Sequence, residues 1–152
     1  MGESESRFGM GRVYLDAAAE ARRRGDRRVS TEHLALALLI DPNSAPARAL
    51  GVSLGATRAA LQELDRDALA NLGISMPSAG PVIPGRVKER LRLTPAAREV
   101  FTGLRREASG KRLGVQHVLL ALLRQQKPDP AAELFDALGV DRTAVRDRLQ
   151  EL

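Results

Sequence analysis

The sequence predicts an all-α domain built from two tandem four-helix repeats, and three observations lead to this prediction. Apolar residues recur at helical spacing along most of the chain, and no segment shows the alternation typical of a strand. Residues 31–39 and 51–64 are matched, in the same order, by residues 115–123 and 139–152. A segment rich in proline and glycine, residues 73–85, separates the copies and is predicted to be a linker. Because a single copy would leave its apolar inner face exposed, we expect the copies to pack face to face with pseudo-two-fold symmetry.

The first repeat is predicted over residues 8–72. Gly25 is suited to end its first helix, and Ser30 or Thr31 can cap the N-terminus of the second. The second helix is apolar nearly all round, so we expect it to be the central buried helix, with Leu36 in the core. The four helices are expected at residues 12–24, 31–40, 45–50 and 54–72.

The second repeat is predicted over residues 86–152 and follows the same plan. Thr94 followed by Pro95 is a strong start signal, because threonine caps a helix and proline is well tolerated at the first helical position. Leu120 occupies the position of Leu36 and is expected to be buried as well. The four helices are expected at residues 95–108, 115–125, 131–138 and 141–152.

Composition excludes several classes of protein. The chain of 152 residues has the length of one domain, so we assign residues 1–152 to a single domain. It contains no cysteine, which excludes disulfides and thiolate zinc sites and fits a cytoplasmic location. No apolar run approaches the roughly 20 residues that span a bilayer, so no membrane association is expected. The net charge is +5, and the basic residues alternate with Glu and Asp along the predicted helices. This pattern favours a solvated helix surface over a nucleic-acid partner.

The motifs of the common enzyme classes are missing from the sequence. Residues 109–112 (Ser-Gly-Lys-Arg) are the nearest approach to a phosphate-binding loop, but the upstream glycine and the following Ser or Thr are absent. His33 and His117 lie at the same position of the two repeats. They are either a metal or acid–base pair, or core histidines bonded to backbone near a helix start, and we favour the second interpretation. We therefore expect no catalytic residues, no metal and no cofactor.

Glu32 is the strongest candidate for a binding residue. It lies in the first turn of the most apolar helix, where a carboxylate is favoured by the helix dipole. Its position has two explanations: the dipole alone, or a carboxylate that binds a guanidinium in a groove between helices. The equivalent of the pair Thr31 and Glu32 in the second repeat is Val115 and Gln116, so the hydroxyl and the charge are absent there.

The doubled pattern resembles the N-terminal repeat domain of the Clp ATPases. The resemblance is carried by residues 29–34 (Val-Ser-Thr-Glu-His-Leu), by 93–98 (Leu-Thr-Pro-Ala-Ala-Arg) together with 114–120, and by the Leu-Gly-Val turn at 138–140. It covers residues 13–152. In that family the domain precedes the ATPase rings of protein unfoldases, where it docks adaptors and substrates, and in some relatives it binds phosphorylated arginine.

The resemblance implies a ligand site in each repeat. A glutamate at the Glu32 position would hold the guanidinium, while the helix start at Thr31 and a threonine on the first helix would meet the phosphate. This chain departs from that pattern, because Arg7 lies near the threonine position of the first repeat, and the second repeat keeps Thr94 but has Gln116 in place of the glutamate. The resemblance therefore implies two incomplete sites, with Thr31, Glu32 and Arg7 in the first repeat and Thr94 and Gln116 in the second. We expect any binding to be asymmetric and carried by the first repeat through Glu32.

The expected function is that of a protein-binding module of the Clp unfoldase and protease system, without catalytic activity of its own. Its partners would be substrates, adaptors, arginine-phosphorylated proteins or the unfoldase itself. Two alternatives stay open: a stand-alone decoy that sequesters Clp-directed ligands, and a binder of a small molecule or peptide in a groove between the repeats. The sequence fits both a stand-alone protein and a fragment of a longer unfoldase.

Overall fold

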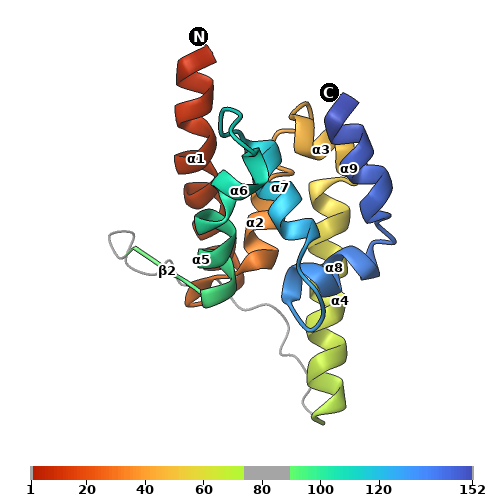
Figure 1. Ribbon diagram of the computed structural model, residues 1–152. Coiled ribbons are helices and arrows are strands. Elements are labelled where there is room, and N and C mark those ends of the chain that lie inside the picture. The colour runs from red at the N-terminus through yellow and green to blue at the C-terminus, as the bar shows by residue number, and fades with distance from the viewer. Residues whose placement is uncertain (1, 74–89, 152) are drawn as a thin grey trace.

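The computed structural model describes residues 2–73 and 90–151, with side chains from Met10 onward, and this part of the chain is mostly helical (Figure 1). The predicted all-α class is confirmed at this level. Most of the predicted linker and the expected start of the second repeat lie outside the described residues. The elements in chain order are α1 (Gly2–Arg24), β1 (Arg28–Val29), α2 (Thr31–Ala37), α3 (Ala45–Leu50), α4 (Leu54–Asn71), β2 (Arg92–Leu93), α5 (Pro95–Thr102), α6 (Leu104–Ala108), α7 (Val115–Leu123), α8 (Pro130–Ala137) and α9 (Arg142–Glu151).

Several helices begin where a short polar side chain caps them. The hydroxyls of Ser53 and Thr94 accept hydrogen bonds from the backbone N–H of the third residue of α4 and α5, at 3.0 and 3.3 Å. Asp129 caps α8 by accepting from two backbone N–H groups. Gly51 ends α3 with φ of 69°, a left-handed conformation that favours glycine. These local signals explain why most predicted boundaries lie close to the observed ones.

The helix expected at residues 95–108 is interrupted, and this prediction was wrong in detail. Gly103 separates α5 from α6 and has ψ of −2°, outside the usual helical range. Glycine is a poor residue for a helix interior, and a Cβ at this position would lie 3.1 Å from the carbonyl oxygen of Glu99. The backbone therefore turns more tightly here than a regular helix.

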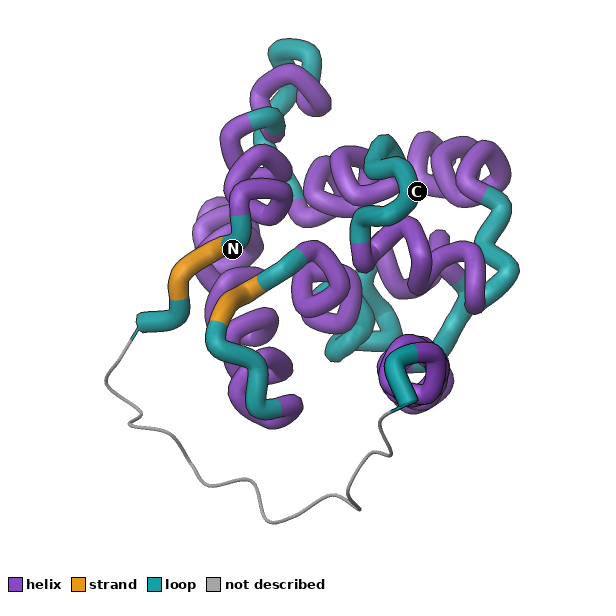
Figure 2. The backbone as a smooth tube through the Cα atoms, turned by 90° about the horizontal axis from the view of Figure 1, so that it is seen from below, coloured by secondary structure: helices purple, strands orange, loops and turns teal. Residues whose placement is uncertain are grey.

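Two short parallel strands, which the sequence did not predict, connect distant parts of the chain (Figure 2). Arg28 is in register with Arg92, and Val29 with Leu93. The backbone N–H of Thr94 continues the pairing by donating to the carbonyl of Val29 at 2.9 Å. Strands of two residues are too short to show an alternating pattern, so periodicity cannot reveal them.

The core is centred on α2 and α7, which lie between α1 and α9 in Figure 1. Every residue of α2 is buried, as expected for the central helix. Small side chains such as Ala17 and Ala21 of α1 are fully buried and allow α1 to approach α2 closely. Leu36 is fully buried, whereas Leu120 is only partly buried. The expectation that both lie in the core is therefore correct for Leu36 and wrong for Leu120.

Polar contacts connect segments from the two predicted repeats. The Tyr14 hydroxyl donates to the carbonyl of Leu91 at 2.7 Å. At the other side of the fold, Nε of Arg148 donates to the carbonyl of Ala49 at 2.7 Å. These contacts fix α1 and α9 against partners far away in the sequence. Among the residues with described structure, no helix has the length and apolar character needed to cross a membrane.

Candidate functional site

A cavity of about 800 Å³ lies between the start of α2, helix α4 and the start of α8, and we name it the Glu32 cavity. Its walls come from both predicted repeats. One wall is apolar and follows α4, with Leu61, Leu64 and Leu69. The other residues that line it are Arg24, Asp26, Arg27, Arg28, Ser30, Glu32, His33, Asp65, Ala68, Pro128, Pro130 and Glu133.

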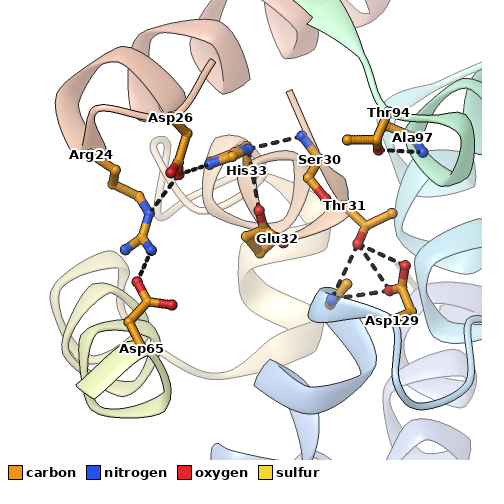
Figure 3. A network of polar contacts seen from close by, with 11 residues as sticks. Arg24, Asp26, Ser30, Thr31, Glu32, His33, Asp65, Thr94, Ala97 and Asp129 are labelled. Atoms are coloured by element: carbon orange, nitrogen blue, oxygen red, sulfur yellow. Dashed lines mark hydrogen bonds and ion pairs between the residues drawn. The ribbon is translucent and has the colours of Figure 1, made fainter. Parts of the chain in front are cut away.

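Glu32 is a buried carboxylate in this cavity. Only 9% of its surface is exposed, and its Oε2 atom has no hydrogen-bond partner among the described residues. Burial raises the pKa of the Glu32 carboxyl above its usual value. Figure 3 shows the side chain between Asp65 of α4 and Asp129 at the start of α8. A buried acceptor without a donor is unfavourable, so this oxygen is a natural point for a ligand to donate a hydrogen bond.

A chain of polar contacts holds the residues beside Glu32 in place (Figure 3). The Asp65 carboxylate pairs with Arg24, and Nε of Arg24 lies 3.2 Å from Oδ2 of Asp26. The same Asp26 oxygen lies 2.8 Å from Nε2 of His33, and Nδ1 of His33 accepts from the backbone N–H of Ser30 at 2.9 Å. The chain links the end of α1 and the start of α2 to α4.

This chain of contacts determines the tautomer of His33. Because Nδ1 accepts a hydrogen bond from the Ser30 N–H, the ring proton lies on Nε2, which donates to Asp26. Burial alone would raise the pKa of Asp26, but the hydrogen bond from His33 and the charge of Arg24 lower it below its usual range. Asp26 is therefore an anion with two partners.

Asp26, Glu32 and His33 lie close enough together to bind one metal ion, since one ligand atom from each lies within 4.8 Å of the others. The histidine does not fit this chemistry. Binding a metal through Nε2 would require an imidazolate, because Nδ1 already accepts from Ser30, and binding through Nδ1 would break that bond. The same bond occupies the lone pair that a general base needs. The arrangement is suited to binding a hydrogen-bond donor.

His117 repeats the backbone contact of His33. Its Nδ1 accepts from the backbone N–H of Gly114 at 2.9 Å, the same distance as in the first pair. Both histidines are buried. The preferred interpretation of the two histidines, bonding to backbone near a helix start, is confirmed.

Thr31, a predicted ligand-binding residue, is fully buried and has protein partners. Its hydroxyl donates to the Asp129 carboxylate, whose oxygens lie 3.0 and 2.9 Å away, and accepts from the Ala131 N–H at 3.2 Å. This contact joins the start of α2 to the start of α8. Thr31 therefore positions the cavity wall and is not among the residues that line the Glu32 cavity.

The other predicted site residues lie apart from the lining of this cavity. The Thr94 hydroxyl caps α5, and Thr94 and Gln116 are not among the lining residues. The Gln116 amide folds over Gly114, where an added Cβ would lie only 2.3 Å from the amide oxygen. The backbone of Arg7 belongs to α1, but its side chain lies outside the described residues. Of the four candidates whose side chains are described, only Glu32 lines the cavity.

Sequence reasoning missed the residues of α4 and α8 that complete the site. Leu61, Leu64 and Ala68 form an apolar stripe at helical spacing, which is a visible signal but indistinguishable from a core face. Glu133 of α8 makes no ion pair with another described residue. The packing of α8 against both α2 and α4 brings this carboxylate to the same cavity as Glu32. No protein-family model matches the chain.

Proposed function

We propose that the chain is a protein-binding module that receives an arginine side chain, free or phosphorylated, in the Glu32 cavity. The observation that carries the proposal is the buried, unpartnered Oε2 of Glu32 in a cavity with an apolar wall. A guanidinium has parallel N–H groups that match a carboxylate, and such charge-assisted hydrogen bonds are stronger than neutral ones. Glu133 adds a second carboxylate without an ion-pair partner among the described residues.

The apolar wall favours a long basic side chain. The methylene groups of an arginine can pack on Leu61 and Leu64 while the charged end reaches Glu32. Arg27 and Arg28 are exposed, line the cavity and make no ion pair with a described residue. They are suited to meet a phosphate on the bound arginine or an acidic group next to it.

We further propose that the module belongs to the Clp type, with two four-helix repeats related by pseudo-two-fold symmetry. The ordered sequence repeat and the matched backbone contacts of His33 and His117 support this. Its partners would then be substrates or adaptors of a Clp unfoldase in the cytoplasm, or the unfoldase itself. In this proposal the chain has no catalytic role, since the His33 lone pair is occupied.

The alternative function, capture of a small molecule or peptide, is favoured by the size of the cavity. A volume of about 800 Å³ lies within the range typical of small-molecule sites, and an apolar wall with a few polar groups is their usual lining. A decoy that sequesters arginine-bearing ligands would use the same cavity. Both alternatives share the Glu32 contact.

Titration calorimetry with an arginine-bearing peptide and with phosphoarginine tests the proposal. We expect both to bind the wild type, and Glu32→Gln to weaken binding by about ten- to a hundredfold, the value of a hydrogen bond to a charged group. Glu63→Gln is the matched control, because Glu63 is an exposed carboxylate on α4 outside the cavity lining. Equal affinity of wild type and Glu32→Gln would disprove the site.

A further inference from the structure

A basic surface beside the Glu32 cavity is formed by Arg27, Arg28 and Arg92, and we name it the arginine face. Arg28 and Arg92 occupy matching positions in the parallel strands β1 and β2. Both are exposed, whereas the next residues, Val29 and Leu93, pack against the core. Neighbouring strands lie about 4.8 Å apart, and matched residues of a parallel pair project to the same side. Arg28 and Arg92 are therefore neighbours across the sheet, and their side chains leave its outer side from adjacent positions.

The guanidinium groups of these arginines have no hydrogen bond or ion pair with any other side chain that the structure describes. Arg24, at the end of α1, contrasts with them because it contacts both Asp26 and Asp65. Like charges placed side by side on neighbouring strands destabilise a sheet. The pair Arg28 and Arg92 is therefore unfavourable in the free protein, and an anion held between the two side chains relieves the repulsion.

We propose that the arginine face docks an acidic segment of a partner protein, rich in aspartate and glutamate. Charge complementarity selects this occupant, since each guanidinium can donate a pair of parallel hydrogen bonds to a carboxylate. Arg27 and Arg28 also line the rim of the Glu32 cavity, so the face extends from the sheet to that rim. Arg92 is not among the residues that line the Glu32 cavity, so substitution of Arg92 tests the face separately from that cavity.

Fluorescence anisotropy with a labelled oligoglutamate peptide that contains no arginine tests the face alone. At low salt we expect the double variant Arg28→Glu, Arg92→Glu to bind about tenfold or more weakly than the wild type. The control double variant Arg105→Glu, Arg112→Glu changes the net charge equally at exposed arginines without described ion pairs. It should change the affinity by less than about twofold. Added salt should weaken the wild-type complex.

The single variant Arg92→Glu separates binding from structural damage. It places opposite charges side by side in the sheet, so we expect a higher midpoint of chemical denaturation together with weaker binding of oligoglutamate. Three results would overturn the proposal: equal affinity for the wild type and the Arg28→Glu, Arg92→Glu variant, an equal loss in the control, or tighter binding of an oligonucleotide of matched charge at the same residues.

Discussion

At the scale of single residues, Glu32 combines two properties that conflict in a purely structural side chain. It is buried, and one of its oxygens has no hydrogen-bond donor among the described residues. Oε1 lies 3.4 Å from Nδ1 of His33, but that nitrogen already accepts from Ser30, so the two atoms are both acceptors. The helix dipole offsets only part of the free-energy cost of burying this carboxylate without a hydrogen-bond donor. Because a buried acceptor without a donor is unfavourable, this placement supports the proposal that Glu32 binds a ligand.

Glu32→Gln should raise the stability of the free protein at neutral pH by about 1 kcal/mol, because it removes the cost of a buried charge. The pH dependence has a definite sign. Burial raises the pKa of Glu32 in the folded state, so the folded protein binds more protons than the unfolded chain between the two pKa values. The contribution of Glu32 to the free energy of unfolding is fully present below the unfolded pKa and is lost as pH rises through the folded pKa.

Urea denaturation of wild type and Glu32→Gln from acidic to neutral pH measures this effect. The difference in unfolding free energy between the two proteins should grow in favour of Glu32→Gln as pH rises, and then become constant. Glu63→Gln, at an exposed carboxylate, should show no such growth. A difference that is independent of pH would mean that Glu32 is not strained by burial.

At the scale of elements, the sequence predicts those helix boundaries that are set by neighbouring residues. Ser53 and Thr94 cap the helices that follow them, and Gly51 ends α3, so these boundaries can be inferred from neighbouring residues alone. The pairing of β1 with β2 depends on contacts between distant residues and leaves no periodic pattern. The same applies to the cavity. Glu32 was identifiable from its helix, whereas Glu133 joins it only through the packing of α8.

Thr31→Val should destabilise the protein by about 1–2 kcal/mol, although the two side chains have similar shapes. The hydroxyl of Thr31 is buried and connects the start of α2 to Asp129 at the start of α8, and its loss leaves polar partners unsatisfied. Thr143→Val is the matched control, because Thr143 is exposed on α9 and should change stability by less than about 0.5 kcal/mol. Equal denaturation midpoints for the two variants would contradict this role of Thr31.

At the scale of the whole molecule, the core gives the cavity fixed walls. The fully buried helix α2 carries Glu32 at its start, so the packing that stabilises the fold also positions the carboxylate. Contacts from Tyr14 to Leu91 and from Arg148 to Ala49 hold the outer helices against it. The two matched leucines of the sequence repeat differ in burial, which makes the core uneven between α2 and α7.

Leu36→Ala should cost about 2–5 kcal/mol of unfolding free energy, because Leu36 is fully buried and its truncation leaves a cavity. Leu120→Ala should cost clearly less, since its side chain is only partly buried and water replaces part of the lost contact. Chemical denaturation of the two variants decides between them. A larger loss for Leu120→Ala would contradict the position of the core on α2.

If Glu32 binds a guanidinium, as proposed, proton release on binding tests this contact most directly. Burial raises the pKa of Glu32 in the free protein, and a bound cation should lower it again, so binding in weakly acidic solution should expel protons. Calorimetric titration of an arginine-bearing peptide in two buffers with different heats of ionisation measures the number released. We predict net proton release by the wild type and none by Glu32→Gln, together with weaker binding. Binding of the peptide without proton release, or release that persists in Glu32→Gln, would contradict the account.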